Sequence, residues 1–183
     1  GEKTMKKFVL AVTALVLTAG ASMAQTVRIA TEGAYPPYNL VNDQGQVDGF
    51  EVALGNELCK RAQLDCTWVK NDWDSIIPNL VSGNYDTIMA GMNITDERRK
   101  SIALSDAYTP PPPSAYVALA ADADVTGIVA AQINTIQAGY VAESGATLVE
   151  FATGEEAIAA VRNGDHTVRG RWSHLMADTT SEL

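Results

Sequence analysis

The sequence has 183 residues, of which 46% are hydrophobic and 19% are charged. This balance is typical of one or two small globular domains and argues against a disordered chain. The formal net charge of −9 argues against binding to nucleic acid or to anionic lipid, and it mildly favours a cationic solute.

Residues 1–24 predict an export signal. Two lysines follow Met5, an apolar run then extends from Phe8 to about Leu17, and small residues end at Ala24. A positive head, an apolar middle and small residues before the cut are typical of a signal peptide, so we expect cleavage before Gln25. The alternative is a membrane span, but the apolar run is shorter than the roughly 20 residues that crossing a bilayer needs.

The chain after the signal alternates between strand and helix patterns. Asp48 is placed to cap the first helix, and Thr95 is placed to cap a short turn that runs to Lys100. Repeated strand and helix units with short links predict parallel sheets covered by helices. The predicted strands are 26–31, 66–69, 86–90, 115–120, 127–131 and 147–151, the predicted helices are 49–62, 75–81, 135–143 and 154–162, and residues 32–46 form a loop.

A proline run divides this pattern into two lobes. Residues 109–113 include four consecutive prolines, which exclude a helix and force an extended path. We therefore place the first lobe at 25–114 and a partial second lobe at 115–164. After Gly164 no strand or helix pattern continues, and both histidines of the chain lie there, so we interpret residues 165–183 as an aberrant tail that is foreign to the fold.

The two cysteines predict a disulfide. Cys59 and Cys66 lie close together between a predicted helix and the next predicted strand. An even count at short spacing in an exported protein favours a disulfide. A metal site is the alternative, but a structural zinc needs about four ligands and no histidine lies near. We expect no metal site and no cofactor.

Four separated segments carry a family resemblance. The chain resembles the polar amino-acid-binding proteins of ABC importers, and most closely those that bind lysine, arginine, ornithine or histidine. This resemblance runs from about Val27 to about Gly164 and includes the cysteine pair. It implies a two-lobed α/β fold of the type II periplasmic-binding-protein class, a periplasmic location, an amino acid or opine held between the lobes, and an inner-membrane ABC permease as partner. The segments are TEGAYPPY at 31–38, GFEV at 49–52, WDSIIP at 73–78 and MAGMNITDER at 89–98.

Arg98 is the predicted partner of the ligand carboxylate, because a guanidinium makes two parallel charge-assisted bonds to it. The alternative is a surface arginine, as Arg99 is expected to be. Ala90 ends a predicted strand and Gly91 and Asn93 follow it, and these three residues offer oxygen atoms to the ligand ammonium. Many relatives carry serine at these places, so the detailed contacts differ here.

Aromatic and acidic residues are predicted to receive the ligand side chain. The resemblance implies that Tyr35 and Trp73 enclose the aliphatic stem, whereas ordinary core packing is the alternative and is the expected role of Tyr38. Glu32 matches the acidic residue that meets a distal cation in relatives; the alternative is a solvated loop glutamate. In the second lobe, Thr135 and Gln137 lie where the family anchors the carboxylate at a helix start.

The C-terminal part departs from the family. Relatives continue after residues 163–165 with a strand that ends in an aspartate for the ligand ammonium, and no such aspartate is identifiable here. We therefore expect an incomplete second lobe with weak or absent ligand binding. The main prediction is a solute-binding receptor without catalytic residues. The alternatives are a non-functional truncated fragment, or an exported dehydratase of the cyclohexadienyl type on the same scaffold.

Overall fold

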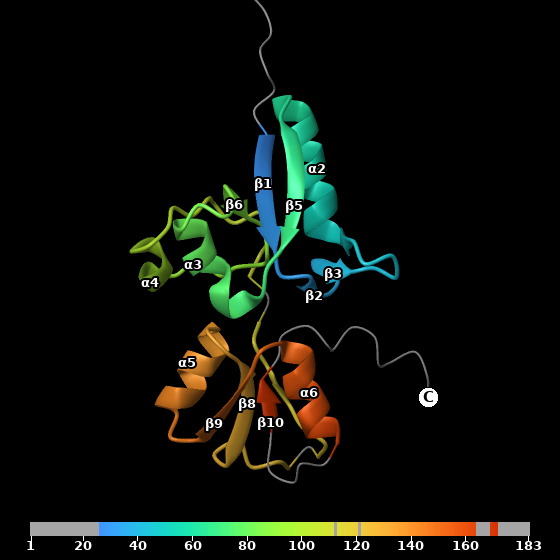
Figure 1. The fold of residues 1–183 in the computed structure, drawn as a ribbon. Coiled ribbons are helices and arrows are strands. Elements are labelled where there is room, and N and C mark those ends of the chain that lie inside the picture. Colours follow the sequence, from blue (N-terminus) through green and yellow to red (C-terminus); the bar gives the residue numbers. More distant parts are fainter. Residues whose placement is uncertain (1–25, 112, 121, 164–168, 172–183) are drawn as a thin grey trace, which may run out of the picture.

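A computed structural model describes residues 26–111, 113–120, 122–163 and 169–171. The predicted export signal and most of the predicted tail lie outside these residues. Figure 1 shows two α/β units, one above the other. The upper unit contains β1, β5, β6 and the helices α2 and α3, and the lower unit contains β8, β9, β10 and the helices α5 and α6.

The first unit is built on a parallel sheet with the strand order β5-β1-β6. The central strand β1 (Thr26–Thr31) pairs along its whole length with β5 (Asp65–Lys70) and near its end with β6 (Thr87–Ile88). Helix α2 (Phe50–Ala62) connects β1 to β5, and helix α3 (Ile76–Val81) connects β5 to β6. The core of this unit is a buried cluster of Ala30, Ile76, Tyr85 and Ala90.

A small antiparallel sheet lies within and directly after the segment for which a loop was predicted. Its strands are β2 (Ala34–Tyr35), β3 (Asn39–Val41) and β4 (Val47–Asp48). The expectation of a loop across 32–46 is therefore only partly right. Strands of two or three residues are too short to show an alternating pattern, and the flanking prolines and glycines dominate the sequence signal.

Backbone carbonyl groups cap the start of α2. The cap residue is Gly49, with φ 116° and no side-chain cap bond, so the prediction that Asp48 caps this helix is wrong. The carbonyl of Pro37 accepts from Phe50 N–H at 3.0 Å, and the carbonyl of Tyr38 accepts from Glu51 N–H at 2.9 Å. Since these carbonyls already occupy the first amide groups, no side-chain acceptor is needed there.

The other short elements of the first unit carry cleft residues. A 3₁₀ turn spans Trp73–Ser75, and helix α4 spans Asp96–Arg99. The prediction that Thr95 caps this turn is confirmed, because its Oγ1 accepts from Arg98 N–H at 3.2 Å. The predicted disulfide is also confirmed, with the two sulfur atoms of Cys59 and Cys66 2.04 Å apart. It ties α2 to β5.

The second unit follows the predicted alternation closely. Its elements are β8 (Ile128–Gln132), α5 (Ile136–Glu143), β9 (Thr147–Phe151) and α6 (Gly154–Arg162). Strands β8 and β9 pair in parallel, and α6 begins with a capping box between Thr153 and Glu156. The strand predicted at 115–120 is shorter, as β7 covers Tyr116–Val117.

One strand lies where none was expected. β10 (Arg169–Arg171) pairs antiparallel with β7 and parallel with β8, so it lies inside the second sheet, whose order is β7-β10-β8-β9. The expectation that no strand follows Gly164 is wrong for these three residues. Their sequence, Arg-Gly-Arg, has no apolar alternation, so the strand depends on backbone pairing that no sequence pattern announces. The division into an incomplete lobe and a tail stays a prediction.

Candidate functional site

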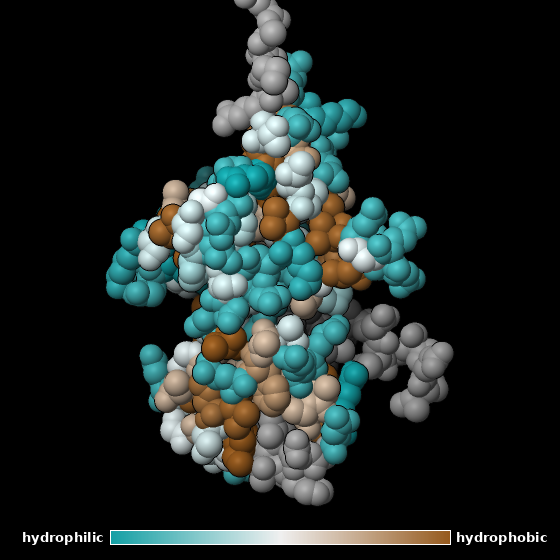
Figure 2. Space-filling view, in the orientation of Figure 1, coloured by the Kyte–Doolittle hydropathy of each residue, from teal (hydrophilic) through white to brown (hydrophobic). Residues whose placement is uncertain are grey.

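Residues at the carboxyl ends of strands from both sheets face the same cleft. Glu32 directly follows the central strand β1, Ala90 and Gly91 follow β6, and Thr135 comes shortly after β8. In open α/β sheets, ligands bind at the carboxyl ends of the strands, where connections leave toward opposite faces. β1 and β8 are such central strands in their sheets. The predicted residues of both units are therefore brought to one cleft, and Figure 2 shows mostly hydrophilic surface where the units meet.

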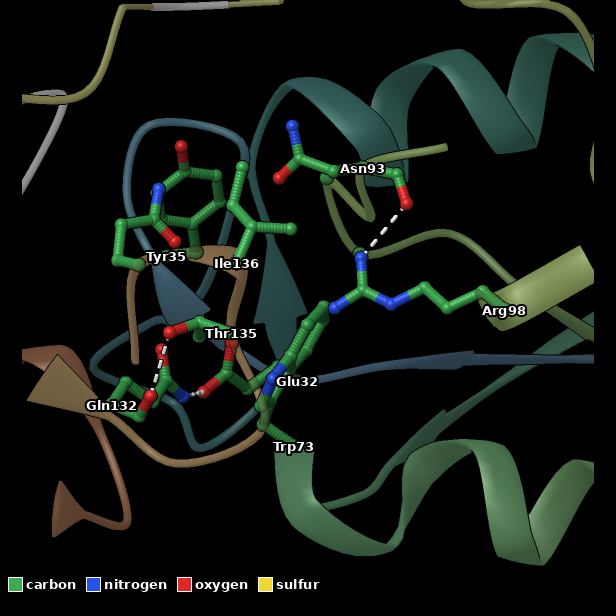
Figure 3. Close-up of a pocket in the computed structure, with 11 residues that line it drawn as sticks. Glu32, Tyr35, Trp73, Asn93, Arg98, Gln132, Thr135 and Ile136 are labelled. Carbon is green, nitrogen blue, oxygen red and sulfur yellow. Dashed lines mark hydrogen bonds between the residues drawn. The ribbon is translucent and has the colours of Figure 1, made fainter. Parts of the chain in front are cut away.

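A pocket in this cleft contains all of the predicted ligand-binding residues. It also contains two residues that were not predicted, Gln132 and Ile136. The sequence contained a sign of the role of Gln132, because it is a single polar residue at the end of an apolar strand. It contained no such sign for Ile136. Figure 3 shows these side chains around the pocket. The lining residues are Glu32, Tyr35, Trp73, Ala90, Gly91, Asn93, Arg98, Gln132, Thr135, Ile136 and Gln137.

Arg98 points into the pocket from the short helix α4. Its guanidinium donates to the carbonyl oxygen of Asn93 at 2.8 Å and to that of Asn134 at 3.1 Å, and its Cζ lies 5.3 Å from the centre of the Trp73 ring. Within the described part of the chain, no ion pair involves Arg98. Burial lowers the pKa of this guanidinium from its usual value. A partly buried cation without an anionic partner is suited to bind a carboxylate.

Glu32 places a buried carboxyl group in the same pocket. Glu32 is 5% exposed, and its Oε1 accepts a hydrogen bond from Gln132 Nε2 at 2.5 Å across the cleft. Burial raises the pKa of Glu32 to about 7, although the hydrogen bond from Gln132 and the charge of Lys70 act in the opposite direction. The alternative of a solvated loop glutamate is excluded by this burial. A cation entering the pocket would stabilise the ionised form of this carboxyl.

Tyr35 forms one wall of the pocket, against the backbone. Gly91 has φ 59°, and a Cβ built there would lie 2.8 Å from Tyr35 Cε1, so only glycine fits beneath this ring. Tyr35 also stacks on Tyr38, with ring centres 5.2 Å apart, and Tyr38 in turn meets Phe50 edge-on at 6.1 Å. Tyr38 does not line the pocket and buttresses Tyr35, in keeping with its expected structural role.

The second unit contributes the start of helix α5. Thr135 caps this helix: its Oγ1 accepts from Ala138 N–H at 3.1 Å and donates to the Gln132 carbonyl at 2.7 Å. Its hydroxyl hydrogen is thus already used, which leaves the first amide groups of α5 as donors for an anion. Asn134 has φ 57°, a conformation that asparagine tolerates better than most residues.

The charged and polar groups of the pocket suit a small polar ion. Among the described residues, no group of three or more His, Cys, Asp or Glu side chains could hold a metal ion. The described helices are also too short or too polar to cross a membrane. The pocket is lined by one buried carboxyl group, one guanidinium, two aromatic rings and the start of a helix.

Residues 27–181 match the bacterial extracellular solute-binding proteins, family 3. The chain belongs to this family. The match reaches residue 181 and so includes most of the segment that the sequence pattern marks as foreign. The lysine/arginine/ornithine-binding and histidine-binding proteins of Escherichia coli, to which the chain is similar, are periplasmic binding proteins and not enzymes.

Two curated relatives show how far the similarity extends. The lysine/arginine/ornithine-binding periplasmic protein of Escherichia coli (strain K12) is 45% identical over 107 residues, which is 56% of this chain and 41% of that protein. The octopine-binding periplasmic protein of Rhizobium meliloti is 45% identical over 97 residues, 52% of this chain and 33% of that protein. The chain therefore aligns with less than half the length of these two solute-binding relatives.

A solved structure gives a stronger match. A periplasmic His/Glu/Gln/Arg/opine family-binding protein from Silicibacter pomeroyi, in complex with lysine, is 70% identical, with a TM-score of 0.76. The similarity covers 79% of this chain and 67% of that structure. The two-lobed α/β fold of type II periplasmic binding proteins is thereby confirmed for this member of the solute-binding family.

Proposed function

We propose that the chain is the ligand-binding part of a periplasmic receptor that binds lysine or another cationic L-amino acid and delivers it to an inner-membrane ABC permease. One observation carries this proposal. The buried carboxyl of Glu32 and the guanidinium of Arg98 line the same pocket, and neither forms an ion pair within the described residues. Two unpaired opposite charges fit a ligand that carries both a carboxylate and a distal cation.

Each part of such a ligand has a matching group in the pocket. Arg98 and the first amide groups of α5 receive the α-carboxylate. The aliphatic stem lies between Tyr35 and Trp73, whose ring faces also favour a positive head. Glu32 receives the distal cation. Oxygen atoms at Ala90, Gly91 and Asn93 accept from the α-ammonium.

The relatives support the same ligand class. The Silicibacter pomeroyi protein was solved with lysine, and the Escherichia coli protein is named for lysine, arginine and ornithine. The octopine-binding protein of Rhizobium meliloti extends this class to octopine, an opine that also joins a carboxylate to a guanidinium-bearing stem.

A ligand panel tests the proposal. Thermal unfolding of the chain is measured with lysine, arginine, ornithine, histidine and octopine, and with glutamate and leucine as controls. A cationic ligand at 100 times its dissociation constant stabilises the folded state by about 2.7 kcal/mol, whereas the controls leave the melting temperature unchanged. Equal stabilisation by glutamate and lysine refutes the proposed ligand class.

The same panel separates a weak receptor from a non-functional fragment. A second protein extends the chain with the part of the Silicibacter pomeroyi protein that the chain does not match. Stabilisation by lysine in the extended protein alone indicates that this chain carries the specificity and lacks part of the binding surface. Delivery is tested by lysine-dependent ATPase stimulation in proteoliposomes that contain the permease, and absence of stimulation despite lysine binding contradicts that step.

A further inference from the structure

A second carboxyl group is buried behind the cleft. Glu51 is the second residue of α2 and is fully buried, at 0% exposure, but it does not line the ligand pocket. Burial raises the pKa of Glu51, while its hydrogen bonds with Asn39 and Gly91 lower it. A buried acid is costly unless its oxygen atoms are satisfied, so its partners indicate what it does.

The partners of Glu51 come from three separate segments. Its Oε2 accepts from Asn39 Nδ2 at 2.7 Å, and its Oε1 accepts from Gly91 N–H at 2.6 Å. The Tyr108 hydroxyl also donates to Oε1. Asn39 extends the chain of bonds, because its Oδ1 accepts from Gly33 N–H at 2.8 Å. One carboxyl group thus gathers donors from β3, from the segment after β6 and from the segment that leads to the second unit.

Two of these donors belong to the walls of the pocket. Gly33 directly follows Glu32, so the bond through Asn39 fixes the turn that aims the Glu32 carboxyl. Gly91 lies beneath the Tyr35 ring, where a Cβ would come within 2.8 Å of it. A shift of either backbone segment would move the acid or the aromatic wall relative to Arg98.

We propose that Glu51 is a positioning residue for ligand binding, which holds the Glu32 turn and the Gly91 wall in register without touching the ligand. This inference rests on the proposed function, since it assigns Glu51 to the same cleft. Tyr108 connects the arrangement to the passage between the units, because it directly precedes Thr109 and the proline run.

With asparagine at position 39, a carboxylate is needed at position 51, because Asn39, Gly91 and Tyr108 all donate hydrogen bonds to it. Replacing Glu51 by glutamine places an NH₂ group against the NH₂ of Asn39. If the Asn39 amide turns over, its NH₂ instead faces Gly33 N–H. One buried donor is therefore unpaired in either arrangement. Exchanging both residues removes this conflict: a glutamine at 51 donates to an aspartate at 39, which still accepts from Gly33 N–H, while the glutamine oxygen still accepts from Gly91 N–H.

The test is a double-mutant cycle of Glu51→Gln, Asn39→Asp and the two together, with Glu57→Gln as control. Glu57 lies on the same helix, is exposed and pairs with Arg61 at 2.7 Å. Lysine dissociation constants are measured by calorimetry at a temperature where circular dichroism shows each variant folded. Each single exchange should weaken binding about tenfold, the double exchange should restore most of it, and the control should change it less than about twofold.

The outcomes separate positioning from general stability. Lower melting temperatures with an unchanged lysine dissociation constant in Glu51→Gln would overturn the proposal, and so would a double variant no better than the singles. If the parent chain binds no amino acid, the receptor function fails, and Glu51 is judged by exchange of the Gly91 and Gly33 amide protons. Faster exchange in Glu51→Gln than in Glu57→Gln, reversed in the double variant, supports the positioning role; equal exchange refutes it.

Discussion

Trp73 and Arg98 donate hydrogen bonds to the same acceptor, the carbonyl oxygen of Asn134, at 3.3 and 3.1 Å. The guanidinium also lies 5.3 Å from the centre of the Trp73 ring, and Figure 3 shows it reaching toward that ring. Both donors belong to the first unit and the acceptor to the second. Arg98 is therefore held by the indole and by the opposite unit.

Replacing Arg98 by lysine should weaken lysine binding by at least about tenfold. An ammonium cannot make two parallel bonds to a carboxylate, and it does not stack on the indole as a guanidinium does. The dissociation constant is measured by calorimetry. The control is Arg99→Lys, since Arg99 is adjacent, exposed and absent from the pocket. Equal loss of affinity in both variants would contradict the assigned role of Arg98.

Glu32 should make the stability of the protein depend on pH. Its pKa of about 7 lies above the ordinary value of 4.5, so between these values the folded state binds more protons than the unfolded state. The free energy of unfolding should fall by about 3 kcal/mol as pH rises from about 4.5 to about 7. Urea unfolding at several pH values measures this, and in Glu32→Gln the difference between the two ends of the range should shrink by about that amount.

Lysine binding should release a proton near pH 6. The ligand cation favours ionised Glu32, whereas the empty pocket holds this carboxyl largely protonated below its pKa of about 7. Calorimetry in two buffers with different ionisation enthalpies should show release of up to about one proton per lysine and rising affinity up to about pH 7. Glu32→Gln should abolish the release and weaken cationic ligands selectively. Equal loss for lysine and glutamine would refute the assignment.

Gly91→Ala should destabilise the protein by about 2 kcal/mol and weaken ligand binding. An alanine at φ 59° costs about 1–2 kcal/mol, and its Cβ would also displace the Tyr35 ring. The control is Gly139→Ala in helix α5, where nothing lies within 4 Å of the added carbon and helix propensity favours alanine. Urea unfolding should show loss for the first variant and none for the second.

The longer elements could be predicted because they bury one face. Helix α6 and strand β9 follow their apolar periodicity and match the predicted bounds, and the Cys59–Cys66 bond follows from spacing and compartment. All predicted ligand-binding residues line one pocket, because most of the family motifs follow the carboxyl ends of parallel strands.

The rest depended on contacts between residues that are distant in the sequence. Gln132 reaches Glu32 across the cleft, a pairing separated by 100 positions that no local pattern can show. The role of Glu51 depends on donors from β3, from the segment after β6 and from Tyr108. Strand β10 is formed by pairing with β7 and β8, so its own three residues carry no signal.

The start of α2 makes this protein sensitive to substitution at Gly49, a residue without a side chain. The carbonyls of Pro37 and Tyr38 hold the first helical amides, and a Cβ at Gly49 would lie 2.6 Å from the Tyr38 oxygen. In a random-mutagenesis library, changes at Asp48, whose side chain accepts from the adjacent Gly49 N–H, should therefore be tolerated, and changes at Gly49 should be strongly depleted. In a helix that begins with serine or aspartate, replacing the polar cap residue is what destabilises the helix start. Here the glycine is the residue that cannot be replaced, and the neighbouring aspartate can.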